Sequence, residues 1–307
     1  MGLLSKYKRW VFAVFIFLSL LIVYVLSQNP LRIPEDGRLV LSKTYILESD
    51  FILKEDASRN YAFKIEVDEI SIDLNGYTIK CEPRSGKDAT FGILGAFRKK
   101  IQIKNGYLEG CVYGVHLRYS DSVTLENISF HRLGYLGINL GGHQNKILNS
   151  SFENFGGYRE EGYTIGINNP GNDCVIQNNT FRELYRQQGV PADVVGEGVG
   201  IIVSDGTNGC VISDNSFTNK QLKNPSTIGI WGYDSSINIE RNTLHNIGSG
   251  IVIMDGSVAN NQLSLDLSKI NDDGAGIYLC AIWVEENATV VRNTITGYPG
   301  PFYRCHH

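Results

Sequence analysis

The sequence predicts an all-β solenoid of about nine stacked coils, each made of short parallel strands. Three observations lead to this fold class. One eight-residue phrase recurs along the chain, a glycine followed by isoleucine or valine precedes most copies, and apolar residues alternate with period two. The composition agrees, because 33 glycines against 8 prolines indicate frequent turns within regular structure. The 42% hydrophobic residues exclude a largely disordered chain, and a net charge of −4 argues against a nucleic-acid binder.

The N-terminal residues are predicted to be an export segment that does not belong to the solenoid. Lys6, Lys8 and Arg9 precede an apolar run at 10–26, after which the chain turns polar. This order is typical of a signal peptide or of an uncleaved membrane anchor, and a buried soluble helix is the third interpretation. We expect 1–27 to be a signal or signal-anchor segment. The remaining chain is then exported, either anchored to the membrane by its N-terminus or released as a secreted or periplasmic protein.

The repeats set the limits of the solenoid. Clear copies of the phrase lie at 101–108, 123–130, 174–181, 210–217, 237–244 and 288–295, and weaker copies at 72–79, 145–152 and 256–263. The paired glycines are Gly92, Gly114, Gly137, Gly166, Gly200, Gly229, Gly250 and Gly276. We therefore predict a linker and N-terminal cap at 28–59, the solenoid at 60–297 and a C-terminal tail at 298–307.

Stacked coils bring equivalent residues of successive repeats into columns. The inward aliphatic column is predicted to hold Ile93, Val115, Ile138, Ile167, Ile201, Ile230, Ile251 and Ile277. An aromatic column is predicted at Phe130, Phe152, Phe181 and Phe217, continued by Leu244, Leu263 and Ile295. Between these two, a buried amide column is predicted at Asn179, Asn215, Asn242, Asn261 and Asn293. Stacked amides can satisfy their own donors and acceptors along such a column.

The six cysteines permit disulfides in an exported protein but are too few for a disulfide scaffold. Cys174 and Cys210 occupy equivalent positions on neighbouring coils. We interpret them as small stacked apolar residues in preference to a disulfide. No C-x-x-C pair supports a zinc or thioredoxin-like site.

With these columns, the chain resembles the right-handed parallel β-helix superfamily, the pectate-lyase-like fold with its asparagine ladder. The phrase at 72–79 resembles the first full coil of many exported β-helix repeat proteins. The resemblance implies the fold and leaves the activity open, because lyases, hydrolases, epimerases and non-enzymes share it. The N-x-D, D-D and G-H-G set expected of polygalacturonase-like hydrolases is absent, and the pattern of calcium-dependent pectate lyases is not clear.

Insertions after the aromatic column are expected to wall off one face of the solenoid. They lie at 153–165, 182–199, 218–228 and 264–275. The adjoining glycine-isoleucine strands point their outward residues into the same groove. The predicted substrate-binding residues are Asn139, Asn168, Trp231, Tyr278, Arg182 and Arg186. Aromatic and hydrogen-bonding residues suit a sugar chain, and the alternative is a solvated face whose aromatic rings cover apolar surface.

One candidate catalytic set lies on these strands. A lyase or epimerase removes the proton next to a uronate carboxylate, so it needs a base, a group that neutralises the carboxylate, and often a tyrosine acid. We predict His116 as the base, Arg118 with Asn139 and Asn168 as the neutralising groups, and Tyr233, several coils away, as the acid. The alternative is that the histidine is an ordinary surface residue.

A second candidate set is acidic. Asp205, Asp234 and Asp255 each follow their coil's glycine by five residues, which predicts a stack on three successive coils. Neighbours ~5 Å apart and an outer pair ~10 Å apart would bracket the separations of glycosidase carboxylates. The same oxygens could bind calcium. Because Asp-Gly dipeptides are ordinary turns, the turn interpretation is preferred and no cofactor or metal site is predicted.

These observations predict an exported, polysaccharide-active protein, a lyase or epimerase acting on a uronate-containing glycan. The alternative is a non-catalytic β-helix of the cell envelope that binds a glycan or a partner protein. We expect a monomer whose partner is a polysaccharide, which binds no nucleic acid and contacts the membrane through its N-terminal segment.

Overall fold

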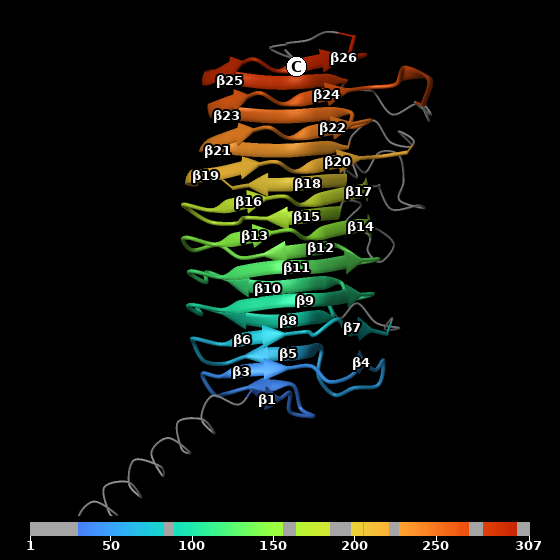
Figure 1. Ribbon diagram of the computed structural model, residues 1–307, viewed down its shortest axis with the longest axis vertical. Helices are drawn as coiled ribbons and strands as arrows, with labels where there is room; N and C mark the ends of the chain where they lie inside the picture. The colour runs from blue at the N-terminus through green and yellow to red at the C-terminus, as the bar shows by residue number, and fades with distance from the viewer. Residues whose placement is uncertain are drawn as a thin grey trace, which may run out of the picture.

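The computed structural model describes residues 30–82, 89–155, 164–184, 198–204, 206–220, 227–269 and 279–299. The export segment predicted at 1–27 lies outside them. The described strands form one 26-stranded sheet whose pairings are parallel. In Figure 1 these strands stack as successive turns of a rod, from β1 at one end to β26 at the other. The predicted parallel solenoid is therefore confirmed.

Each coil contributes to three faces. The first face carries the glycine-isoleucine strands, which are β2 (Arg38–Leu39), β5 (Tyr61–Ile65), β8 (Phe91–Ala96), β10 (Tyr113–Arg118), β12 (Leu136–Asn139), β15 (Thr164–Asn168), β18 (Gly198–Val203) and the first parts of β21 (Ile228–Glu240), β23 (Ser249–Ala259) and β25 (Cys280–Val291). Nine of these described strands, β5 to β25, follow residue 60, as the repeat count predicted.

The second face precedes the sharp bend of each coil. It is formed by the later parts of β21, β23 and β25 and by β1 (Leu31–Arg32), β3 (Thr44–Ile46), β6 (Ser71–Asp73), the first parts of β9 (Gln102–Glu109) and β11 (Thr124–His131), β13 (Lys146–Leu148), β16 (Val175–Gln177) and β19 (Asn208–Ser213). Parallel pairing thus already begins at Leu31, within the residues 28–59 for which the sequence predicted a linker and cap.

The third face follows the bend. It is formed by the later parts of β9 and β11 and by β4 (Phe51–Leu53), β7 (Thr78–Cys81), β14 (Ser151–Phe155), β17 (Thr180–Leu184), β20 (Ser216–Thr218), β22 (Thr243–His245), β24 (Gln262–Ser264) and β26 (Thr294–Thr296). A short 3-10 helix, η1 (Leu267–Lys269), follows β24. No helix in the described part of the chain is both long and apolar enough to cross a membrane.

The aliphatic column of the first face is buried as predicted, with one correction at its end. Strand register aligns Ile93, Val115 and the following isoleucines up to Ile251, all at most 1% exposed. The next member is Ile282, because Ile251 pairs with Ile282. The predicted Ile277 lies outside the described residues. The sequence misled because Ala281 replaces the usual glycine before Ile282, while Gly276 and Ile277 imitate the phrase.

The aromatic column explains the repeated glycine. Phe130, Phe152, Phe181 and Phe217 stack with ring centroids 4.5–4.8 Å apart and planes within 7° of parallel. A Cβ atom at Gly166 would lie 2.8 Å from the Phe181 ring and 2.6 Å from the carbonyl oxygen of Gly200. Both distances are shorter than van der Waals contact, so any side chain at this position would collide with the ring and with the neighbouring strand. Glycine is therefore needed where the first-face strand passes close to the stacked rings.

The predicted amide column is confirmed as a continuous ladder at the bend between the second and third faces. Each Nδ2 donates to the next Oδ1 at 2.9–3.0 Å, along Asn179, Asn215, Asn242, Asn261 and Asn293. From Asn215 onward, each Oδ1 also accepts the backbone N–H of the preceding asparagine at 2.8–2.9 Å. The first four side chains are at most 1% exposed, so the ladder satisfies the buried polar groups of these successive bends.

The interpretation of Cys174 and Cys210 as unbonded stacked residues was wrong. Register places them on neighbouring coils with Cα atoms 4.4 Å apart, and they form a disulfide. Cys81 and Cys111 form a second disulfide, with Cα atoms 4.8 Å apart. The reason is geometric, because the spacing between stacked strands falls within the range that a disulfide bridges.

Candidate functional site

The outward side chains of the first face lie in two columns, because both the glycine and the following isoleucine face the core. The pre-glycine column contains Tyr61, Phe91, Tyr113, Leu136, Ile165, Val199, Ile228, Ser249 and Cys280. The post-isoleucine column contains Lys64, Leu94, His116, Asn139, Asn168, Ile202, Trp231, Val252 and Trp283. The post-isoleucine column is thus polar at His116, Asn139 and Asn168, whereas the pre-glycine column beside it forms a buried apolar cluster at Leu136, Ile165, Val199 and Ile228.

His116 lies half-buried among aromatic rings. Its ring centroid is 5.3 Å from that of Phe91 and 5.2 Å from that of Tyr113. Its Nδ1 is buried and has no hydrogen-bond partner among the described residues. Burial, and then the positive charge of Arg118, lower the pKa of His116 to about 4. The imidazole is therefore neutral at physiological pH, so one of its two ring nitrogens carries a lone pair.

Arg118 supplies a cation beside this imidazole. It follows His116 by two residues on β10, so both side chains leave the same face of the strand. Its Nη2 donates a hydrogen bond to the Tyr119 hydroxyl at 3.0 Å, and its guanidinium lies 5.0 Å from that ring's centroid. These contacts orient an exposed guanidinium next to His116, where it can pair with a carboxylate.

Two amides continue the site on the next coils. Strand register pairs His116 with Asn139 and Asn139 with Asn168. Both asparagines are half-buried, and neighbouring side chains in such a column are about 5 Å apart. The structure thus brings together four of the predicted residues, a neutral imidazole, a guanidinium and two amides, over three adjacent coils.

Tyr233 is not part of this group. Register runs from His116 through Asn139, Asn168 and Ile202 to Trp231, which is four strand spacings or roughly 19 Å. Tyr233 lies beside Trp231, with ring centroids 6.4 Å apart, so it cannot reach the same sugar as His116.

The tyrosine next to His116 is Tyr113, which the sequence interpretation missed. Phe91 stacks on Tyr113 at 4.9 Å, and Tyr135 packs edge-on against Tyr113 at 5.5 Å. The signal that could have found it is the aromatic residue immediately before the small inward residue of three successive first-face strands, namely Tyr61 before Ala62, Phe91 before Gly92 and Tyr113 before Gly114.

The predicted pairing of Asp234 with Asp255 in the aspartate stack is not observed. Asp255 pairs with Ser236 and not with Asp234, because the register shifts between Gly232 and Ser236. Asp255 Oδ1 accepts the backbone N–H of Gly256 at 2.6 Å, as an aspartate in a turn does. Asp205 and the side chain of Asp234 lie outside the described residues. Within the described chain, no group of three or more His, Cys, Asp or Glu is arranged to hold a metal ion.

Of the predicted substrate-binding residues, Arg182 lies on another face. It belongs to β17 of the third face and pairs with Glu153 and Thr218, because that strand extends into the predicted insertion. Tyr278 and Arg186 lie outside the described residues. Trp231 points outward from the first face and is half-buried beside Ile228 and its neighbours, a small apolar cluster separate from the core.

Comparison with known proteins identifies the architecture. Residues 58–217, just over half of the chain, match the family model described as the right-handed β-helix region. No curated protein sequence matches the chain.

Several solved structures share the fold. An alginate lyase from Paenibacillus sp. str. FPU-7 is 15% identical with a TM-score of 0.58, covering 86% of this chain and 92% of the lyase. PfbA, a surface adhesin of Streptococcus pneumoniae, is 15% identical with a TM-score of 0.51, covering 86% and 81%. GH136 lacto-N-biosidase from Eubacterium ramulus is 10% identical with a TM-score of 0.51, covering 83% and 59%. At such identities the likeness concerns the fold alone.

Proposed function

Because this chain belongs to the right-handed β-helix family, whose coil exposes a long strand face, we propose that its first face binds an acidic polysaccharide and acts on it as a lyase or epimerase. One observation carries the proposal. His116, whose buried Nδ1 has no partner among the described residues, is in register with Asn139 and then Asn168 on the next two coils, and Arg118 lies two residues further along its own strand. A neutral imidazole next to a cation and two amides matches what proton removal beside a uronate carboxylate requires.

In this proposal the carboxylate is held by Arg118 and the two amides, which stabilise the negative charge that develops as the C5–H bond breaks. His116 accepts the C5 proton. In a lyase the electron pair forms a C4=C5 double bond while the C4–O bond to the next sugar breaks, and the departing oxygen takes a proton. In an epimerase the same carbanion is reprotonated from the opposite side. Tyr113 is the nearby tyrosine for either proton delivery.

Binding of the substrate carboxylate is also expected to raise the basicity of His116. Arg118 is one of the two causes that lower the pKa of His116. A carboxylate paired with Arg118 offsets this positive charge, so the pKa of His116 rises when the substrate binds. The imidazole therefore becomes a stronger base where the proton is to be removed.

Lyase and epimerase share proton abstraction, so one assay covers both. The protein is incubated with alginate, polygalacturonate and hyaluronate in D₂O. Deuterium at C5 is followed by NMR, and the unsaturated uronate product by ultraviolet absorbance. We expect exchange or elimination on one substrate and a loss of roughly 100-fold or more in His116→Phe. His143→Phe is the matched control, because the His143 side chain is 62% exposed and lies outside the first face.

The non-catalytic alternative has one observation in its favour, since a histidine with a pKa of about 4 is a weak base before substrate binds. Acidic-polysaccharide binding that needs Arg118, with no exchange or elimination on any substrate, would establish a binding protein. Absence of both binding and turnover would refute a glycan site on the first face.

We also propose that the β-helix is exported. The charged and apolar N-terminal segment supports this, and so do two disulfides, which persist in oxidising compartments. Cell fractionation, with thiol labelling of the denatured protein before and after reduction, tests the proposal, because all four disulfide cysteines are buried in the folded chain. A cytosolic protein with four reactive cysteines among Cys81, Cys111, Cys174 and Cys210 would contradict it.

A further inference from the structure

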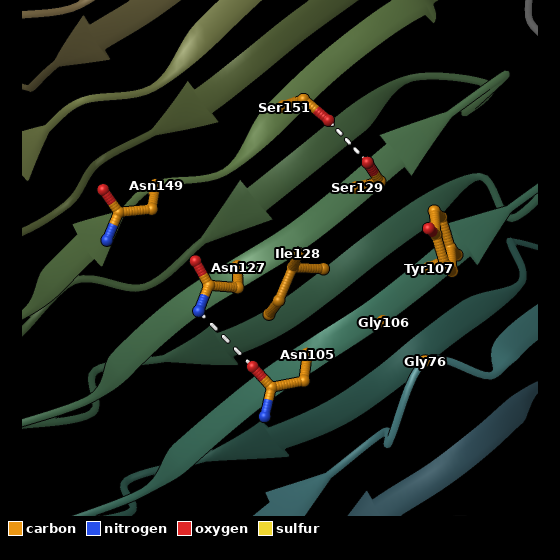
Figure 2. Close-up of a pocket in the computed structure, with 9 residues that line it drawn as sticks. All are labelled: Gly76, Asn105, Gly106, Tyr107, Asn127, Ile128, Ser129, Asn149 and Ser151. Carbon is orange, nitrogen blue, oxygen red and sulfur yellow. Dashed lines mark hydrogen bonds between the residues drawn. The ribbon is translucent and has the colours of Figure 1, made fainter.

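A second hollow lies away from the first face, at the outer side of the bend between the second and third faces. Its volume is about 350 Å³, and it shares no residue with the His116 site. Figure 2 shows its lining, whose polar and aromatic side chains are Asn105, Asn127, Asn149, Tyr107, Ser129 and Ser151. We name it the bend groove.

Backbone geometry aims three amides into this groove. The residue just before the inward position of each bend has a left-handed conformation, with φ of 60° at Asn105, 54° at Asn127 and 50° at Asn149. Asparagine tolerates this conformation better than most residues. The buried inward positions of these three bends are taken by the residues that follow, Gly106, Ile128 and Ser150, so the three asparagine side chains lie on the outside. In Figure 2 the three amides follow one another across adjacent strands, and neighbouring coils are about 5 Å apart.

Much of the hydrogen-bonding capacity of these amides is unused. Asn105 donates to Asp73 at 3.1 Å, and Asn127 donates to Asn105 at 3.4 Å. The side chain of Asn149 has no hydrogen-bond partner among the described residues and is exposed. Each amide offers both a donor and an acceptor. The row can therefore bind a ligand that presents groups of both kinds.

Tyr107 forms one wall of the groove. Its side chain is 50% exposed, and its strand neighbours on the third face are the small residues Thr78 and Ser129. Ser129 and Ser151 share a hydrogen bond of 2.6 Å between their hydroxyls. Small neighbours leave the phenol ring accessible. An accessible aromatic ring next to amides and hydroxyls combines stacking with hydrogen bonding.

The charge distribution limits the ligand. No charged side chain lines the groove. The same outward position is occupied by Asp214 two coils beyond Asn149 and by Arg241 on the coil after that. The Arg241 guanidinium donates hydrogen bonds of 2.8 and 3.0 Å to the Asp214 carboxylate, so this cation is already paired. At the other end Lys104 pairs with Asp73 at 3.6 Å. An anionic ligand would be desolvated in the groove without a cation to pair with, which is unfavourable. An uncharged ligand does not need such a cation, so the lining suits it better.

We propose that the bend groove binds a neutral oligosaccharide. One sugar ring stacks on Tyr107, and the hydroxyls of this sugar and its neighbours bond to Asn105, Asn127 and Asn149. The site is independent of the first face, so the protein holds a neutral glycan at the bend whether or not it acts on an acidic one.

The test uses cellohexaose, mannohexaose, xylohexaose and maltohexaose as probes. Binding is measured by calorimetry and by the side-chain amide resonances of Asn105, Asn127 and Asn149, with protein made in a bacterial host so that the N-x-S sequences at Asn127 and Asn149 stay unmodified. We expect one probe to bind and to shift these resonances. Tyr107→Ala should weaken it by about tenfold, the equivalent of one lost stacking contact.

Tyr233→Ala is the matched control, since its side chain is 49% exposed but lies on the first face. It should retain affinity for the neutral probe. Tyr107→Ala should retain the melting temperature and any activity on uronates, so a failure of this proposal is separable from a failure of the first-face proposal. No binding of any probe, or equal losses in the two tyrosine variants, would overturn the bend-groove site.

Discussion

Replacing Asn242 by leucine tests the ladder at its best-connected rung. Asn242 is completely buried. Its Nδ2 donates to the carbonyl of Ile212 at 2.9 Å and to Asn261 Oδ1 at 3.0 Å. Its Oδ1 accepts the backbone N–H of Asn215 at 2.9 Å and the Asn215 Nδ2 at 3.0 Å. Leucine has a similar size, so the substitution removes these hydrogen bonds with little change of packing volume.

The expected loss follows from the groups left unpaired. The backbone N–H of Asn215 loses its acceptor, and the carbonyl of Ile212 loses this donor. Asn261 Oδ1 keeps the backbone N–H of residue 242, so it is not orphaned. A buried polar group left unsatisfied costs about 1–3 kcal/mol, so two such groups give a loss of about 3 kcal/mol in the free energy of unfolding.

Urea unfolding measures the global loss, and hydrogen exchange at the Asn215 amide gives a local readout. The control is Asn105→Ser, where the side chain lies outside the bend and loses a hydrogen bond to Asp73 at 3.1 Å and a long, exposed one from Asn127 at 3.4 Å. We expect this control to lose less than about 1 kcal/mol. Equal effects of the two variants, or unchanged exchange at Asn215 in Asn242→Leu, would refute the argument that the inward amides carry the stability of the bend.

Three further predictions concern the first face. For wild-type protein, kcat/KM on an acidic polysaccharide should rise with pH around pH 4 and stay level through pH 6–7, because His116 must be unprotonated to accept a proton and its pKa is about 4. An acid limb near pH 6.5 would contradict this. Gly166→Ala should lower the free energy of unfolding by about 3 kcal/mol through its contacts with Phe181 and Gly200. Gly76→Asn should cost only about 1 kcal/mol, because a Cβ there meets nothing within 4 Å and asparagine tolerates the left-handed φ of 80° at this position; thermal melts compare the two variants. Trp231→Ala should weaken acidic-glycan binding while costing under about 2 kcal/mol, since the side chain points outward; a larger loss would mean that it mainly packs.

The sequence predicted the core columns because stacking makes each of them depend on one local rule. A large apolar residue in a third-face strand packs on another in the next coil, and a buried asparagine pairs with the next asparagine, so each pattern repeats over several successive coils. Where the rule is relaxed the prediction failed. Ala281 serves in place of glycine, and Cys174 pairs covalently with Cys210 at a spacing that unbonded residues also accept. Neither case breaks the stacking, so nothing in the repeat reveals it.

The outward residues obey no such rule, and their positions depend on the register of each strand. Counting from the glycine placed His116, Asn139 and Asn168 correctly because the strands between Gly114 and Asn168 are regular. The same count failed for Asp234 and Asp255, because the register shifts beyond Gly232 and a residue five positions from the glycine has passed that shift.

Distance along the rod imposes a second limit on what the sequence can predict. Residues of the same type on one face are separated by about 4.8 Å for every intervening coil, so Tyr233 resembles a catalytic acid in kind but lies four spacings from His116. Tyr113 is within ring contact of that histidine, yet it precedes the glycine, where the alternation of a regular strand would direct it inward. Because glycine and the next residue both face the core, the residue before them points outward. A catalytic set on this fold therefore has to be sought within two or three neighbouring coils and on both sides of the glycine.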